Sequence, residues 1–180
     1  MPQIALEKDG WQIEPTAKRD LLARIRKVGP PLTGFIEDRV YRGVTTGRND
    51  AFELTVDEAN KLFALDEKNR EVIFPYLTGD DVERWSTAEA DRYLIFTRRG
   101  IDISAYPHIL AHLEKFRVSL EPRPKDWRPT PEQEKWPGRK AGSYGWYEIQ
   151  DNTAYWEKFL KRKIISTKIS FRPTFCVDSS

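Results

Sequence analysis

The sequence contains a single cysteine, Cys176, among its 180 residues. One cysteine excludes a disulfide within the chain and argues against a thiolate metal site. No stretch approaches the roughly 18 apolar residues that a membrane span needs, and the first residues lack a basic segment followed by an apolar run. We therefore expect a soluble protein of the reducing cytoplasm that has no membrane partner.

The short motifs that mark many enzymes are also missing. The sequence has neither a Gly-x-Gly-x-x-Gly dinucleotide loop nor a Gly-x-x-x-x-Gly-Lys-Ser/Thr phosphate loop, and no Gly-x-Ser-x-Gly nucleophile turn occurs. It also lacks the Asn-Pro-Pro-Tyr type of loop expected at an adenine-N6 methylation centre. We predict that this chain has no catalytic residue and binds no cofactor of its own.

Two groups of residues have the chemistry of metal ligands. His108 and His112 lie four apart, which puts both rings on one face of a helix, but no glutamate lies between them and no third ligand is near. Asp80 and Asp81 could bind Mg²⁺, although adjacent carboxylates in a glycine-containing turn more often cap a helix. We favour ordinary histidines and a helix cap, and we predict no metal site.

The composition is that of a folded chain. Hydrophobic residues make up 39% and charged residues 32%, and the chain has six Trp, seven Tyr and nine Phe. Its length suits one domain that is large enough to bury a core. We predict a single compact α+β domain over residues 1–180, with a mixed or antiparallel sheet and flanking helices.

Hydrophobic periodicity predicts where the elements lie. Helical spacing predicts helices over residues 17–28, 56–65 and 104–120. The first ends at Gly29-Pro30-Pro31, and the second begins with a capping box formed by Thr55 and Glu58. Apolar runs predict strands over residues 35–45, 51–54, 92–97, 146–149, 163–170 and 174–177, with 92–97 central in a sheet. A short helix or extended piece is expected over residues 67–76, and a short helix over residues 154–160.

A polar loop interrupts the apolar residues between 41 and 52. Gly43 and Gly47 bracket the loop and allow its backbone to turn sharply or to approach a ligand closely. Such a loop suits contact with a polar partner, and an ordinary hairpin turn is the alternative. Its hydrogen-bonding and charged side chains are Arg42, Thr45, Thr46, Arg48 and Asn49.

Basic residues gather in the C-terminal third. Residues 1–114 hold 16 Lys+Arg against 20 Asp+Glu, whereas residues 115–172 hold 14 against 7. Residues 121–145 form a basic insert rich in Pro, Gly and Trp in which no regular element fits. Cations that neutralise phosphate, together with planar rings, suit a nucleic-acid surface, and a solvated face is the alternative. The candidates are Arg123, Lys125, Arg128, Arg139, Lys140, Tyr144 and Trp146.

Several segments of the sequence, taken in order, resemble those of one known family. The clearest is Arg42-Gly43-Val44-Thr45-Thr46-Gly47-Arg48 with its continuation to residue 52. The others are residues 71–85, 92–101, 106–123, 146–149 and 163–165. This succession resembles the TaqI-type C-terminal specificity domain, which is the target-recognition part of adenine-N6 DNA methyltransferases and of type IIG restriction-modification enzymes. The chain departs from that pattern in its long insert over residues 124–145 and in lacking a catalytic domain.

The resemblance implies a module that reads bases in the major groove of duplex DNA. A partner methyltransferase domain or subunit, with its S-adenosylmethionine, would flip and methylate the adenine. Arg48 would then pair with guanine and Asn49 with adenine, while Thr45 and Thr46 would contact a thymine methyl group or a phosphate. Arg42 is a further DNA candidate. The cations and rings of the insert would contact phosphate and sugar.

Two other function classes fit parts of the sequence. A small metal-dependent nuclease would use Asp80, Asp81 and Glu83, but a lysine at a suitable spacing and a second carboxylate cluster are missing. An RNA-binding or protein-interaction domain would use the same aromatic and basic segment. We favour a DNA recognition module without a catalytic centre of its own.

Overall fold

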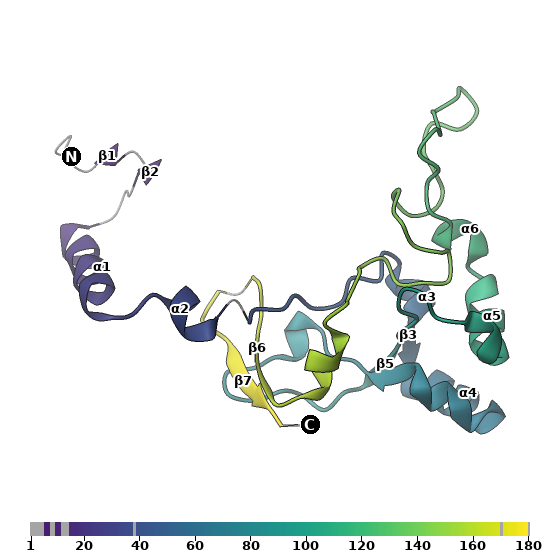
Figure 1. Ribbon diagram of the computed structural model, residues 1–180, viewed down its shortest axis with the longest axis horizontal. Helices are drawn as coiled ribbons and strands as arrows, with labels where there is room; N and C mark the ends of the chain where they lie inside the picture. The colour runs from purple at the N-terminus through teal and green to yellow at the C-terminus, as the bar shows by residue number, and fades with distance from the viewer. Residues whose placement is uncertain (1–5, 8–9, 12–14, 38, 170, 180) are drawn as a thin grey trace. The chain divides into compact units, whose positions relative to one another are not determined.

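A computed structural model describes residues 6–7, 10–11, 15–37, 39–169 and 171–179 (Figure 1). Residues 1–42 and 43–180 form separate compact units, and each is described by itself. The α+β class with antiparallel strands is confirmed. A single recognition domain over residues 1–180 stays a prediction.

The first unit is built from short elements. Strands β1 (Leu6–Glu7) and β2 (Gly10–Trp11) pair antiparallel, and helices α1 (Thr16–Val28) and α2 (Leu32–Ile36) follow. The predicted helix over residues 17–28 is confirmed and ends, as expected, at Gly29. The strand predicted over residues 35–45 is wrong, because α2 begins directly after Pro31 and residues 39–46 join no sheet.

A three-stranded antiparallel sheet lies at the centre of the second unit. Its strands β3 (Glu53–Thr55), β5 (Arg92–Ile95) and β4 (Ile73–Pro75) are arranged in that order. The register places Leu54 opposite Tyr93, and Phe74 opposite Leu94. The predicted central strand is thus confirmed as β5. The strand predicted over residues 51–54 begins only at Glu53, because residues 49–52 form helix α3 (Asn49–Phe52).

The helices of the second unit follow the sequence pattern only in part. Helix α4 (Val56–Leu65) begins with the predicted capping box between Thr55 and Glu58. The helix predicted over residues 104–120 is broken into η4 (Ile103–Ala105), α5 (Pro107–Glu114) and α6 (Arg117–Leu120). Short 3-10 turns, η2 (Glu67–Glu71), η3 (Gly79–Asp81) and η5 (Trp156–Leu160), complete the helical elements.

The C-terminal part contains an irregular stretch followed by a two-stranded ribbon. Residues 121–145 are irregular, as predicted. The strand predicted over residues 146–149 is wrong, since these residues form turns. Strands β6 (Lys163–Ser166) and β7 (Phe175–Asp178) pair antiparallel side by side at the yellow end of the chain in Figure 1.

The core joins the sheet to helices α3 to α6 and to the turn before residue 150. Its apolar side chains are shielded from water, which is the main favourable term in folding. The largest apolar side chains that are fully buried are Phe52, Leu54, Ile95, Ile109, Leu113, Leu120 and Ile149.

Candidate nucleic-acid interface

Residues 43–50, termed the Thr46 loop, are fixed to the core through their backbone. The Thr46 carbonyl accepts hydrogen bonds from the Gln150 backbone N–H and from Arg139 Nη1, both at 3.1 Å. The Thr45 carbonyl accepts a bond from the Asp151 N–H at 3.1 Å. The backbone of the loop is therefore fixed by hydrogen bonds from residues about one hundred positions later in the sequence.

The Thr46 side chain holds the loop together from inside. It is 1% exposed, and its hydroxyl donates to Asn49 Oδ1 at 2.6 Å and accepts from the Arg48 N–H at 3.1 Å. Contact of Thr46 with a thymine methyl group or a phosphate is therefore a wrong prediction, because the side chain faces the protein. Thr45 is half-buried beside it.

Arg48 and Asn49 lie on the outside of this loop, at the start of α3. Arg48 Nε lies 2.9 Å from Asp50 Oδ1, and both side chains remain about half exposed. An exposed ion pair of this kind is worth about 0–1 kcal/mol, so the guanidinium can leave it for a stronger partner. Arg42, also exposed, is the last residue of the first unit.

Gly47 lets the loop close tightly against the core. Its φ is +79°, and a Cβ placed there would lie 2.8 Å from Gln150 Oε1 and 3.0 Å from Arg139 Cδ. Both the left-handed backbone and the close packing require glycine. The Thr46 loop therefore turns tightly at Gly47, directly before α3 begins at Asn49.

Arg139 is the residue that joins these parts. It is 4% exposed, and all five of its guanidinium N–H groups are directed at backbone carbonyls. Nε donates to Leu120, Nη1 to Thr46 and Glu148, and Nη2 to Gly145 and Trp146, over distances of 2.8–3.1 Å. A phosphate contact for Arg139 is therefore a wrong prediction, because its donors are already used inside the protein.

The charge of Arg139 is retained despite its burial. Desolvation lowers its pKa to about 10, while Tyr144 and the nearby carboxylates of Glu121 and Glu148 oppose that shift. The guanidinium therefore stays protonated at neutral pH. Because the donor is charged, each hydrogen bond from Arg139 to a carbonyl is stronger than a bond between two neutral groups.

Tyr144 and Glu148 complete the buried polar cluster. The Tyr144 hydroxyl donates to the Lys140 carbonyl, and its ring lies 4.4 Å from the Arg139 guanidinium carbon and 5.0 Å from that of Arg99. Contact of Tyr144 with sugar or phosphate is therefore a wrong prediction. The buried Glu148 carboxylate accepts bonds from the N–H groups of Gly100 at 2.6 Å and Gly145 at 2.8 Å.

Sequence reasoning missed Glu148 and Arg99 as parts of this cluster. Arg99 lies 3.6 Å from Glu148 and donates to the carbonyls of Ile149 at 2.5 Å and Gln150 at 2.7 Å. One signal was available, because Glu148 is an acid inside the otherwise apolar run of residues 146–149. A carboxylate in such a run has to find donors when it is buried.

The basic insert is closed at a narrow neck. Pro122 and Arg139 form a parallel bridge, in which the Arg123 N–H donates to the Arg139 carbonyl at 2.9 Å and the Arg139 N–H to the Glu121 carbonyl at 3.0 Å. Trp136 Nε1 also donates to the Glu121 carbonyl, at 2.9 Å. Beyond the neck, the insert projects past α6 (Figure 1).

Some of the predicted cations lie at the neck of the insert and others lie farther along it. Arg123 and Lys140 flank Arg139 at the neck and are exposed, whereas Lys125 and Arg128 are exposed farther along the insert. Trp146 is half-buried, and the Arg117 guanidinium carbon lies 4.0 Å from its ring centre. One face of that ring is therefore already covered by a cation.

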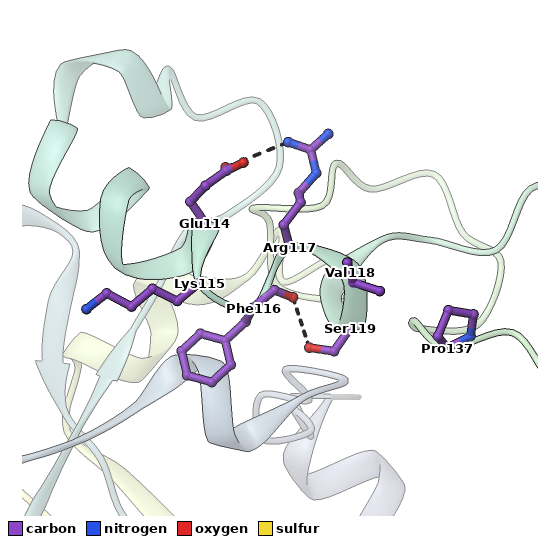
Figure 2. Close-up of a pocket in the computed structure, with 7 residues that line it drawn as sticks. All are labelled: Glu114, Lys115, Phe116, Arg117, Val118, Ser119 and Pro137. Carbon is purple, nitrogen blue, oxygen red and sulfur yellow. Dashed lines mark hydrogen bonds and ion pairs between the residues drawn. The ribbon is translucent and has the colours of Figure 1, made fainter.

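A surface hollow of about 320 Å³ lies at the break between α5 and α6 (Figure 2). It is lined by residues 114–119 and Pro137. Glu114 faces Arg117 at 3.8 Å, and the Ser119 hydroxyl donates to the Phe116 carbonyl at 2.9 Å (Figure 2). The hollow therefore brings together no nucleophile and base among its lining residues.

Two of the four metal-ligand candidates, Asp81 and His112, contact polar groups of the protein itself. Asp81 accepts hydrogen bonds from the N–H and the hydroxyl of Thr78, and these bonds lower its pKa. His112 Nε2 lies 3.2 Å from the Ala51 carbonyl oxygen. Over the described part of the chain, no three His, Cys, Asp or Glu side chains gather where they could hold a metal ion. No helix among the same residues is long and apolar enough to cross a membrane.

The sequence matches no family model, and no curated protein matches it. The resemblance to the TaqI-type specificity domain therefore stays a prediction, and the site is judged by its geometry.

Proposed function

We propose that this chain is a sequence-specific recognition module for duplex DNA and that it serves an adenine-N6 methyltransferase domain or subunit. The observation that carries the proposal is the placement of Arg48 and Asn49. Their side chains are exposed on a loop whose backbone is fixed by the buried Arg139. A rigid support with two adjacent polar side chains is a suitable device for reading base edges.

The chemistry of the two side chains fits such readout. The forked guanidinium of Arg48 matches the two major-groove acceptors of guanine. Asn49 Oδ1 already accepts one bond from the Thr46 hydroxyl, and its second lone pair and the Nδ2 donors match the donor and acceptor of adenine. Because the Thr46 loop is already ordered, less conformational entropy is lost when it binds. Thr45 and Arg42 flank the same pair in the sequence and are proposed as additional DNA contacts.

The exposed cations of the insert are proposed to bind phosphates. Arg123 and Lys140 adjoin Arg139 at the neck, while Lys125 and Arg128 extend the charge along the insert. Phosphate contacts set position and orientation but carry no direct sequence information. The two groups of residues therefore have separable roles in affinity and in specificity.

Methyl transfer is proposed to take place in the partner. The motif content of this chain offers no loop for S-adenosylmethionine, and the buried polar groups around Arg139 are used for structure. The partner would extrude and methylate the adenine while this chain holds the duplex in register. The order of sequence phrases from residue 42 to residue 165 supports this division.

Selection from a library of randomised duplexes tests the proposal. The full chain is incubated with the library at several salt concentrations, and bound duplexes are amplified and sequenced. We expect one short motif to be enriched, and single-stranded DNA and RNA of the same composition to compete poorly, because specific binding survives competitor better than general charge attraction. A bound pool that stays random, or equal competition by RNA, would overturn the proposal.

A further inference from the structure

The β6–β7 ribbon exposes one apolar face. Ile164 and Val177 lie directly opposite each other in the register, and both are exposed, as is Phe175. On the other face, Ile165 pairs with Cys176, which is buried. The ribbon therefore has an inner face packed on the protein and an outer apolar face in water, which folding alone does not explain.

The loop between β6 and β7 contains two further apolar side chains that are exposed to solvent. Ile169 is 90% exposed and Phe171 is fully exposed. Across residues 161–177 the sequence has five cations, Lys161, Arg162, Lys163, Lys168 and Arg172, and no Asp or Glu. With Asp178 at the end of β7, residues 161–178 hold five cations against one carboxylate. An apolar tip on a ribbon with this excess of positive charge fits a polyanion that also offers apolar surface between its charged groups.

Trp85 extends this surface from a neighbouring turn. Its backbone N–H donates to the Phe175 carbonyl at 2.8 Å, so the turn lies directly against β7. The Trp85 φ is +77°, a left-handed conformation that favours glycine, and yet the indole is 72% exposed. A large aromatic residue held at such a position in water is better explained by contact with a ligand than by packing.

The base of the ribbon is joined to the rest of the protein by several contacts. Lys163 Nζ forms an ion pair with Asp178 across the two strands and donates to the Phe159 carbonyl at 2.6 Å. Together with Cys176 and the bond to Trp85, these contacts fix the strands while the tip extends into solvent.

We propose that the β6–β7 ribbon, with Trp85 at its side, is a second DNA-binding element that inserts Ile169 and Phe171 between base steps and bends the duplex. This inference rests on the proposed function in duplex DNA binding. Apolar wedges that enter the minor groove unstack one step and kink the DNA, while flanking cations hold the phosphates on either side. The ribbon would thus bind sequence-independently and complement readout by Arg48 and Asn49.

Ligase-mediated ring closure measures bending directly. The probe is a duplex of about 100 base pairs, which is shorter than the persistence length of about 150 base pairs and so rarely closes unaided. We expect the full chain to increase the yield of circles. In the double variant Ile169→Ala/Phe171→Ala, this increase should be at least about fivefold smaller, while the affinity for the duplex should fall by no more than about threefold. Phe35→Ala, which removes another exposed phenylalanine, is the matched control and should behave like the wild type.

The outcomes separate this inference from the proposed function. A chain that selects a DNA motif but leaves ring closure unchanged, or a double variant that closes rings as well as the wild type, would overturn the ribbon assignment alone. A chain that binds no duplex would overturn both. Loss of binding to phosphatidylserine vesicles in the double variant, with ring closure unaffected, would assign the tip to a membrane surface and overturn the inference.

Trp85→Gly gives a readout that a purely structural residue would not give. Glycine removes the strain of a left-handed backbone and, because the indole is 72% exposed, little packing is lost, which offsets the added freedom of the unfolded chain. The variant should therefore unfold at a temperature equal to or higher than that of the wild type. If the indole contacts DNA, the same variant should bind the 100-base-pair duplex several-fold more weakly. Equal or higher stability with unchanged affinity would overturn the assignment of Trp85.

Discussion

Arg139 Nη1 donates a hydrogen bond of 3.1 Å to the carbonyl oxygen of Thr46, which lies 93 positions earlier in the sequence. The same nitrogen donates to the Glu148 carbonyl at 2.8 Å. One buried side chain thus joins the proposed DNA-reading loop to the turn that ends the basic insert. We expect the order of the loop to depend on the arrangement of the Arg139 hydrogen bonds as well as on the positive charge of this side chain.

Arg139→Lys tests that geometry while keeping a positive charge. Lysine has one nitrogen and cannot reach five carbonyls, so buried acceptors are left without donors at about 1–3 kcal/mol each. We expect the free energy of unfolding in urea to fall by about 3 kcal/mol or more. Arg123→Lys, at an exposed position of the neck, is the control and should change stability by less than about 0.5 kcal/mol. Equal urea midpoints for the two variants would contradict the role of Arg139.

Gly47→Ala tests the tight turn of the Thr46 loop. The added methyl group would lie 2.8 Å from Gln150 Oε1, and the alanine would have to adopt a φ of +79°. We expect a loss of about 1–3 kcal/mol in stability. Gly43→Ala offers a control in the same loop, because nothing lies within 4 Å of the added atom, and it should be neutral or slightly stabilising. Thermal unfolding of the two variants side by side measures the difference, which should vanish if the loop rearranges freely.

Arg48→Ala and Asn49→Ala test base readout. Each variant should weaken binding to the selected motif by about 1–3 kcal/mol and leave binding to random duplex nearly unchanged. Lys125→Ala should instead weaken binding to every sequence and flatten the salt dependence by about one unit. Titrations of both duplexes at several salt concentrations separate these patterns. If Lys125→Ala were the sequence-selective variant, the assigned roles would be reversed.

His112 should make stability depend on pH. Burial lowers its pKa, and although the bond to the Ala51 carbonyl and the charge of Glu58 oppose that shift, Lys115 adds to it. The unfolded chain then binds a proton more readily than the folded one, so stability is full above about pH 7 and falls as the pH drops below the ordinary histidine value of about 6.5. The carboxylates with lowered pKa, such as Asp81, act only at lower pH.

His112→Gln removes the titrating group and keeps a donor for Ala51. We expect urea midpoints of the wild type to fall between pH 7.5 and pH 5.5, and those of the variant to change less. Parallel slopes for the two proteins over this interval would show that His112 does not titrate differently on folding.

Local signals in the sequence predicted several elements correctly. The capping box at Thr55 and Glu58 depends on side chains three residues apart, so it forms wherever the helix begins. The continuous apolar run before Phe96 indicates a strand covered on both sides, and β5 is central in its sheet. The Pro- and Gly-rich composition of residues 121–145 likewise predicted an irregular segment.

Elements that depend on distant contacts were not predictable in this way. A strand was predicted over residues 51–54, but Ala51 and Phe52 belong to α3, in which the Ala51 N–H donates to the Arg48 carbonyl at 3.2 Å. Residues 146–149 form an apolar run with one acid and were predicted as a strand, yet their carbonyls and the Glu148 carboxylate are used by Arg139, Arg99 and Gly100. In a run of basic residues, nothing local distinguishes the buried Arg139 from the exposed Lys140.

Because the neck between Pro122 and Arg139 is closed, the outer part of the insert can be replaced by another segment without changing the neck. Its ends already lie together, so changing its length alters the cost of closing the loop only slowly, by about 0.6 kcal/mol for each doubling. Grafting a different segment in place of residues 124–135, with Trp136 and Arg139 retained, should therefore leave the remainder folded. Descendants of such a protein could acquire new phosphate contacts without redesigning the part that reads bases.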